Sequence, residues 1–242
     1  MNTLCVIPAR YASTRLPGKP LADIAGKPMI SRVFDRASKA KLVTGVIAAV
    51  DDERVYEAVV KNGGTAMMTR KDHATGTDRL AEVAAAHPEA ELIINVQGDE
   101  PLIDPEIIDA LAAAFDEDKE LQMATVKSPM HDKEEMTNPN NVKVVTDKNG
   151  YALYFSRSLM PYPREDTGVT VYKHIGIYAY KRDFLLNYAK MEPTPLEKTE
   201  SLEQLRALEN GFRIKVIETE QTFVGVDTAE DLAKVNEIYK NM

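Results

Sequence analysis

The composition of the chain is that of a folded protein of ordinary size. It has 242 residues, of which 44% are hydrophobic, enough to bury a sizeable core as one domain or as a domain with a smaller lobe. The formal net charge of -8 disfavours nucleic acid or an anionic membrane as the main partner. No signal-peptide pattern and no apolar run of roughly 18 residues is present, which predicts a cytoplasmic protein outside the membrane.

The first strand-like run leads into a cationic loop. Residues 4–7 are apolar and stop at Pro8, and the following residues carry Arg10, Arg15 and Lys19 without an acid. Neither a Walker loop nor GxGxxG is present, so this loop would have to bind phosphates through side-chain charge. Ligands of open α/β sheets bind at the carboxyl ends of strands, and this position favours phosphate binding over a merely solvated basic loop.

From this loop to residue 128 the chain alternates between strand and helix patterns. Strands are predicted at the short, mainly apolar runs of residues 45–50, 65–69, 92–96 and 123–126. Helices are predicted at residues 28–37, after Asp52, at 78–86 and at 107–115. This rhythm predicts an α/β fold, with a Rossmann-like, mostly parallel sheet and helices on both faces.

Polar residues follow two of these strands at the same predicted edge. Thr77 is placed to cap the helix after residues 65–69, while Gly76 allows close backbone approach. Gln97, Gly98 and Asp99 directly follow the strand at 92–96. A hard divalent cation that bridges phosphate oxygens needs one or two such carboxylates, so Asp99 is a candidate metal ligand as well as a turn residue.

The pattern changes after residue 128. Residues 142–146 and 151–154 flank a Lys-Asn-Gly turn, which predicts a hairpin, and residues 160–168 form a proline-containing loop or lid. A strand at 174–181 would place His174 and Tyr178 on one face.

The last part of the chain predicts two helices around a final strand. The first, at residues 199–209, would bury Leu202, Leu205 and Leu208 and leave Glu200 and Gln204 one turn apart on another face. After a strand at 213–218, Asp227 and Glu230 form a possible N-cap pair for the terminal helix.

Six motifs in chain order carry a resemblance to a known family. They are IPARYASTRLPGKPL at residues 7–21, NVQGDEP at 95–101, YFSR at 154–157, KHIGIYAY at 173–180, LEQLRALENG at 202–211 and GVDTAEDL at 225–232. Together they resemble the 3-deoxy-manno-octulosonate cytidylyltransferases, or CMP-Kdo synthetases, of the sugar nucleotidyltransferase superfamily. The resemblance implies a single domain, residues 1–242, with a glycosyltransferase-A-like fold. Residues 1–128 would bind nucleotide, 129–212 would form a smaller mixed α+β lobe for the acceptor sugar and a homodimer contact, and 213–242 would return to the main sheet.

The resemblance also implies the residues of the site. Arg10, Lys19, Asp99 and Asp227 are expected to be catalytic, with Mg²⁺ on Asp99 and Asp227. The expected nucleotide-binding residues are Pro8, Ala9, Arg10, Arg15, Lys19, Arg70, Thr75, Gly76, Thr77 and Gln97. The expected sugar-binding residues are Gln97, Arg157, His174, Tyr178, Glu200 and Gln204. The chain departs from the family pattern His-Gln-Ser-Gly-Thr, since Ala74 and Thr75 replace the glutamine and serine.

The implied reaction joins CTP to the acidic eight-carbon sugar Kdo (3-deoxy-D-manno-octulosonate), giving CMP-Kdo for lipopolysaccharide biosynthesis and pyrophosphate. The anomeric hydroxyl would attack the α-phosphorus directly, and charge neutralisation and positioning would supply most of the catalysis. Three alternatives stay open: the 8-amino analogue of Kdo as acceptor, a sialic acid cytidylyltransferase, and a non-catalytic CTP-binding protein. The sialic acid alternative is disfavoured because Tyr11-Ala12-Ser13 replaces the Gly-Ser continuation of that family's loop.

Overall fold

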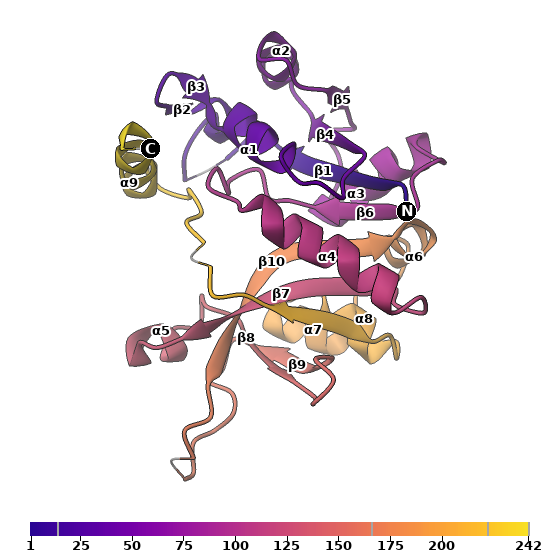
Figure 1. Ribbon diagram of the computed structural model, residues 1–242, viewed down its shortest axis with the longest axis vertical. Helices are drawn as coiled ribbons and strands as arrows, with labels where there is room; N and C mark the ends of the chain where they lie inside the picture. The colour runs from indigo at the N-terminus through magenta and orange to yellow at the C-terminus, as the bar shows by residue number, and fades with distance from the viewer. Residues whose placement is uncertain (14, 166, 222, 242) are drawn as a thin grey trace.

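The centre of the protein is one large sheet with helices packed around it (Figure 1). A computed structural model describes residues 1–13, 15–165, 167–221 and 223–241. Within these residues the sheet has nine strands, seven of them in the order β11-β7-β10-β6-β1-β4-β5, with β8 paired to β10 and to β9. The strands are β1 (Thr3–Ala9), β4 (Gly45–Val50), β5 (Ala66–Met68), β6 (Leu92–Asn95), β7 (Met123–Met130), β8 (Lys143–Thr146), β9 (Ala152–Ser156), β10 (Val171–Lys181) and β11 (Ile214–Glu218).

The smaller elements surround this sheet. The helices are α1 (Met29–Ala37), α2 (Glu53–Lys61), α3 (Gly76–Ala86), α4 (Pro105–Glu117), α5 (Lys133–Thr137), α6 (Arg182–Tyr188), α7 (Pro195–Glu200), α8 (Leu205–Glu209) and α9 (Ala229–Lys240). A 3-10 helix, η1 (Lys19–Leu21), precedes a two-stranded sheet of β2 (Asp23–Ile24) and β3 (Lys27–Pro28). No helix in the described ranges is long and apolar enough to cross a membrane.

The strand directions confirm the predicted α/β class. β1 runs parallel to β4 and β6, and β4 runs parallel to β5, as the repeated strand and helix pattern predicts. Within the row of seven strands β10 is the exception, because it lies antiparallel between β6 and β7. This row is therefore mostly parallel with one reversed strand near its middle.

Helices cover both faces of the sheet. Along β1, Cys5 and Ile7 pack into a cluster with α1, α2 and α4, whereas Leu4 and Val6 pack into a second cluster with α3, α6 and α8. This alternation follows from the two-residue period of a strand. Cys5 is fully buried, and burial raises the pKa of its thiol to about 12, so it is a core residue as expected.

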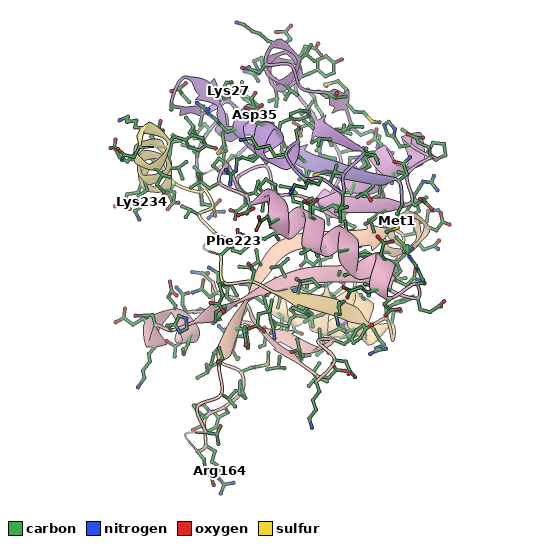
Figure 2. The ribbon with its side chains drawn as sticks, in the orientation of Figure 1. Met1, Lys27, Asp35, Arg164, Phe223 and Lys234 are labelled. Carbon is green, nitrogen blue, oxygen red and sulfur yellow. The ribbon has the colours of Figure 1, made fainter. Side chains whose placement is uncertain are left out.

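The part of the chain after residue 128 is interleaved with the main sheet. β7 runs through the predicted boundary, and β10 returns to the sheet between β6 and β7. The predicted hairpin is present as β8 and β9, which pair antiparallel, and β11 pairs parallel with β7. A long arm connects β9 to β10 and extends away from the body, with Arg164 at its far end (Figure 2).

The continuous helix predicted at residues 199–209 is wrong. α7 ends at Glu200, Ser201 adopts a left-handed conformation with φ 52°, and α8 begins at Leu205. A buried ion pair joins the two short helices, since Arg206 Nη2 lies 2.5 Å from Glu197 Oε1. The sequence pattern predicts that Glu200 and Gln204 share one helix. Because of this break they do not.

Candidate active site

The strand register brings three loops to one edge of the sheet. In the parallel pairs Ala9 lies opposite Val50, and Val6 lies opposite Asn95, so the loops after β1, β4 and β6 emerge together. Gly98 lies so close to β1 that a Cβ atom there would be 2.7 Å from the Pro8 carbonyl oxygen. Only glycine permits this approach, which places Asp99 beside the cationic loop.

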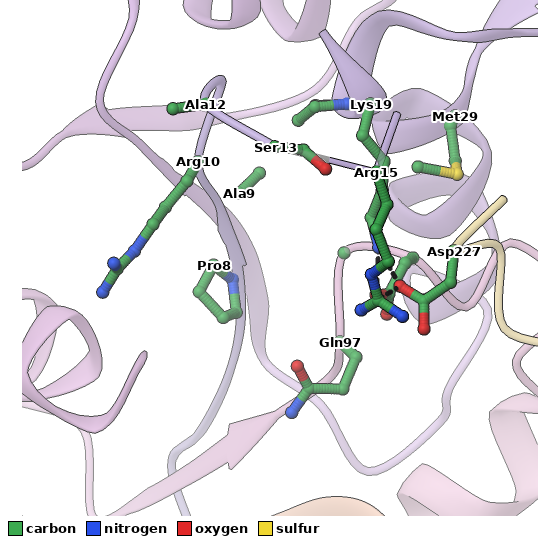
Figure 3. A pocket seen from close by; sticks show the side chains of 13 residues that line it. Pro8, Ala9, Arg10, Ala12, Ser13, Arg15, Lys19, Met29, Gln97 and Asp227 are labelled. Atoms are coloured by element: carbon green, nitrogen blue, oxygen red, sulfur yellow. Dashed lines mark hydrogen bonds and ion pairs between the residues drawn. The ribbon is translucent and has the colours of Figure 1, made fainter. Parts of the chain in front are cut away.

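A cleft of about 360 Å³ opens at this edge, and we call it the charged cleft. It is lined by Pro8, Ala9, Arg10, Ala12, Ser13, Arg15, Lys19, Pro20, Met29, Gln97, Gly98, Asp99 and Asp227. Figure 3 shows Arg15 and Lys19 directed towards Asp227, with Arg10 pointing the other way. Most of the predicted phosphate and metal residues therefore meet in one place.

Lys19 joins the two predicted metal carboxylates. Its Nζ lies 2.6 Å from Asp99 Oδ2 and 2.9 Å from Asp227 Oδ1, and Arg15 Nη2 lies 3.0 Å from the same Asp227 oxygen. Burial alone would lower the pKa of Lys19, but the two carboxylates outweigh it and raise that pKa. The ammonium is therefore charged at neutral pH, and the carboxylates of residues 99 and 227 face one shared cation position.

The terminal segment reaches the cleft through a backbone contact. Val226 donates its N–H to the Asp99 carbonyl, with an N···O distance of 2.9 Å. The predicted N-cap role of Asp227 is wrong, because Thr228 caps α9 in a capping box with Asp231. The Asp227 side chain is therefore not used to cap the helix and points into the cleft.

Glu100 lies behind the cleft and was not predicted to matter. Burial first, and then the neighbouring Asp99, raise the pKa of its carboxyl to about 7. Its Oε2 atom has no hydrogen-bond partner among the described residues. Burial and the adjacent carboxylate of Asp99 therefore both oppose the charged form of Glu100.

A second cavity of about 170 Å³ lies next to the cleft, and we call it the aromatic cavity. It is lined by Pro8, Gly76, Thr77, Asn95, Gln97, Met123, Tyr178, Tyr180, Tyr188, Glu203 and Gln204. Pro8 and Gln97 line both spaces, and Gln97 is held by a 2.8 Å hydrogen bond from its Nε2 to the Gly176 carbonyl. The two spaces are therefore adjacent and share Gln97 at their border.

The start of α3 has a different cap from the one predicted. Thr75, not Thr77, is the N-cap, and its hydroxyl accepts from the Asp78 N–H. Thr77 instead donates its hydroxyl to Glu203 Oε2 at 3.0 Å. Neither Thr75 nor Arg70 lines the charged cleft or the aromatic cavity, and Arg70 pairs with Asp72 at the surface.

Some of the expected sugar-binding residues line the aromatic cavity, and the others do not. Tyr178 and Gln204 line the aromatic cavity, together with Gln97. His174 is buried, with Nε2 2.9 Å from the Thr125 hydroxyl and its ring centroid 5.4 Å from that of Tyr178. Burial lowers the pKa of His174 to about 3, so its imidazole is neutral at pH 7.

Glu200 and Arg157 form a separate unit beside the cavity. Glu200 accepts hydrogen bonds from the Ser156 hydroxyl at 2.6 Å and from the Arg157 N–H at 2.9 Å. Arg157 in turn donates Nε to the Glu200 carbonyl at 2.7 Å and Nη1 to the Pro139 carbonyl at 3.0 Å. These side chains connect β9 to α7 and do not line the aromatic cavity.

Comparison with known proteins identifies the family. The cytidylyltransferase family model matches residues 4–217. A 3-deoxy-manno-octulosonate cytidylyltransferase of Fusobacterium nucleatum is 57% identical over 235 residues, covering 97% of this chain and 96% of the relative. One from Syntrophotalea carbinolica is 53% identical, with 97% of each chain covered. The chain belongs to the 3-deoxy-manno-octulosonate cytidylyltransferase family.

Solved structures agree with this assignment. A structure of CMP:2-keto-3-deoxy-manno-octonic acid synthetase in complex with CTP superposes with a TM-score of 0.96 at 46% identity, covering 100% of this chain and 99% of the other. A 4-diphosphocytidyl-2C-methyl-D-erythritol synthase from Anaerococcus prevotii has a TM-score of 0.65 at 16% identity, which shows a shared fold alone. The cytidylyltransferase fold therefore extends over the whole chain.

The magnesium ion implied by the cytidylyltransferase resemblance fits the donor set of the cleft. Asp99 and Asp227 supply hard carboxylate oxygens that already face one cation, the Lys19 ammonium. The described residues contain no group of three or more His, Cys, Asp and Glu arranged to hold a metal. Two carboxylates suit magnesium, which takes one or two protein ligands and completes its shell with water and substrate phosphates.

Sequence reasoning missed several residues that line the two spaces. Glu203 is the most informative of them, because it lies within the LEQLRALENG motif yet was assigned no role. Its Oε1 atom has no hydrogen-bond partner among the described residues, and burial raises the pKa of its carboxyl. The family resemblance, not the helical pattern, assigned Glu200 and Gln204 to the sugar, and neither signal gave a role to Glu203.

Proposed function

We propose that this protein transfers the cytidylyl group of CTP to the acidic eight-carbon sugar Kdo, giving CMP-Kdo and pyrophosphate for lipopolysaccharide biosynthesis. The observation that carries the proposal is the meeting of Lys19, Asp99 and Asp227 in a cleft that also holds Arg15. These residues are far apart in the chain and are brought together at the sheet edge. The aromatic cavity adjoins this cleft through Gln97 and would hold the acceptor.

The chemistry follows from the charges of the cleft. The anomeric hydroxyl oxygen of the sugar forms the new bond to the α-phosphorus, the bond from that phosphorus to the bridging oxygen of the β-phosphate breaks, and the hydroxyl proton is lost to solvent. Arg15 and Lys19 balance the charge that develops on the departing pyrophosphate. Magnesium held by Asp99 and Asp227 would supply Lewis-acid polarisation of the phosphate and hydroxyl oxygens.

Pyrophosphate release tests this function directly. With CTP, Kdo and magnesium the protein should release pyrophosphate and form CMP-Kdo in equal amounts, and omission of Kdo should stop both. Binding of CTP without pyrophosphate would instead support the non-catalytic alternative. Competition between Kdo and its 8-amino analogue would show which acceptor has the higher kcat/KM.

We further propose that the arm between β9 and β10 forms a homodimer contact in the cytoplasm. Tyr162 and Val169 are 83% and 62% exposed, and they line a space of about 780 Å³ with Leu159 and Pro161. Exposed apolar groups in one place mark interaction surfaces. Light scattering after size exclusion should give twice the mass of one chain, and Tyr162→Glu should shift the protein towards the monomer.

A further inference from the structure

One buried carboxylate connects the cationic loop to the rest of the sheet edge. Asp51 follows β4 directly and is 9% exposed. Its Oδ1 accepts the Tyr11 N–H at 3.0 Å, in the first part of the cationic loop. Its Oδ2 accepts from Arg79 Nη2, also at 3.0 Å. A single side chain therefore contacts both the loop after β1 and helix α3.

Arg79 is fully buried on α3 and has further contacts at the same edge. Its Nη1 donates to the Thr69 hydroxyl, which in turn donates to the Val50 carbonyl at 2.8 Å. Burial lowers the pKa of this guanidinium, and the Asp51 carboxylate opposes that effect. A guanidinium in the interior is costly without such a partner, so the fold retains both charges together.

The position of Arg79 on α3 places this ion pair close to predicted nucleotide-binding residues. Gly76 and Thr77, which line the aromatic cavity, lie within one turn of Arg79 at the start of α3. On the other side, Tyr11 directly follows Arg10 in the loop that lines the charged cleft. The Asp51–Arg79 pair therefore lies between two groups of predicted nucleotide-binding residues, one on the loop and one on α3.

We propose that Asp51 and Arg79 are positioning residues for the nucleotide. The ion pair fixes the separation between the cationic loop and the start of α3, so that the triphosphate and the nucleobase of one CTP molecule are bound at the same time. This role deepens the proposed function and rests on it. It concerns nucleotide binding alone and places no residue in contact with the reacting atoms.

The test compares CTP, which has both a triphosphate and a nucleobase, with inorganic triphosphate, which has no nucleobase. Calorimetric titrations with CTP and with inorganic triphosphate, both with magnesium, are carried out on the wild type and on Asp51→Asn. A displacement of ~1 Å is enough to cost up to about a hundredfold in a positioned system, and we expect CTP affinity to fall at least tenfold. Inorganic triphosphate has no nucleobase to reach the start of α3, so its affinity should change less than threefold.

A matched control and a second variant separate positioning from folding. Asp109→Asn removes a carboxylate that accepts the Lys41 and Leu42 N–H groups at 3.0 and 2.8 Å and lines neither the cleft nor the aromatic cavity, so it should leave CTP affinity unchanged. If Asp51→Asn folds poorly, Asp51→Asn with Arg79→Met leaves no unpaired buried charge. That double variant should regain thermal stability but keep the reduced CTP affinity.

Three results would overturn the proposal. The first is unchanged CTP affinity in the Asp51 variants, and the second is an equal loss of affinity for CTP and inorganic triphosphate. The third is a wild type that binds CTP no more tightly than inorganic triphosphate. A wild type that binds CTP in the expected way but releases no pyrophosphate with Kdo would contradict the proposed reaction and leave the positioning role standing.

Discussion

The charged cleft and the aromatic cavity lie side by side, but the first is lined mainly by charged and polar side chains and the second mainly by aromatic and polar ones. In the cleft, charged side chains on loops form ion pairs with one another, and Arg15 remains 66% exposed at the side chain. In the cavity, aromatic residues from β10 and α6 surround a small number of buried polar atoms. The cleft is suited to a flexible, highly charged ligand, and the cavity is suited to recognition of a ring through its hydroxyl groups.

This difference has an energetic consequence. Cleft residues act on charge that changes during the reaction, so their loss should lower kcat. The cavity residues outside α3 act through burial and hydrogen bonds to the acceptor, so their loss should raise the KM of the sugar. Measurements of kcat and of the KM of the sugar therefore distinguish the two regions.

The largest effect is expected from Asp99→Asn. The amide keeps the shape of the side chain but loses the charge that attracts a cation, and a loss of roughly a hundredfold to a thousandfold in kcat follows. Pyrophosphate release at saturating CTP and Kdo measures it. Asp104→Asn is the control, because Asp104 caps α4 outside the cleft and asparagine caps helices equally well. A kcat within tenfold of the wild type would remove Asp99 from the catalytic set.

Lys19→Met should cost at least roughly a hundredfold in turnover. Methionine retains most of the side-chain volume but removes the ammonium that contacts Asp99 and Asp227. The matched control is Lys27→Met, since Lys27 pairs with Asp35 at 2.5 Å outside the cleft (Figure 2). Near-normal pyrophosphate release by Lys19→Met would show that the cation does not act on the triphosphate.

The sequence predicted the cleft well because its residues follow strands directly. The apolar runs fixed where β1 and β6 end, so the positions of Lys19 and Asp99 at one edge followed from the rules of parallel sheets. Asp227 could be added only through the family resemblance, because a loop aspartate before a helix is equally typical of an N-cap. The structure decided between these roles by placing the cap at Thr228.

The cavity was predicted less well because it depends on long-range packing. The reversed strand β10 brings Tyr178 and Tyr180 beside residues of α3 and of the segment between α7 and α8, and no local pattern signals that reversal. No glycine or proline at Ser201 predicts the break in the helix there. The family resemblance assigned Glu200 and Gln204 to the sugar, and the helix expected across that break gave no signal for Glu203.

Glu203→Gln should raise the KM of the acceptor sugar about tenfold and leave the KM of CTP nearly unchanged. Glu203 lines the cavity, and its Oε1 atom has no hydrogen-bond partner among the described residues and lies 3.8 Å from Arg206 Nη2, so a sugar hydroxyl would gain a strong acceptor there. Initial rates with each substrate varied in turn measure the two constants. Glu209→Gln is the control, since Glu209 accepts the Leu196 N–H outside the cavity. Equal rises in both KM values would contradict a sugar-specific role.

The smallest effect is expected from His174, in the pH dependence of stability. Its folded pKa of about 3 lies below the ordinary value of 6.5, so the unfolded chain binds the proton more readily. The stability that this neutral histidine contributes is complete above about pH 6.5 and is lost as the pH falls towards 3. Between pH 7 and pH 5 the wild type should lose ~2 kcal/mol from this residue.

The variant His174→Gln should have a smaller loss of unfolding free energy over the same pH range, measured by urea denaturation at pH 7 and pH 5. Identical losses in the two proteins would mean that the imidazole is not held neutral in the folded state. A neutral His174 also bears on the acceptor, because it offers no positive charge to the sugar carboxylate at pH 7.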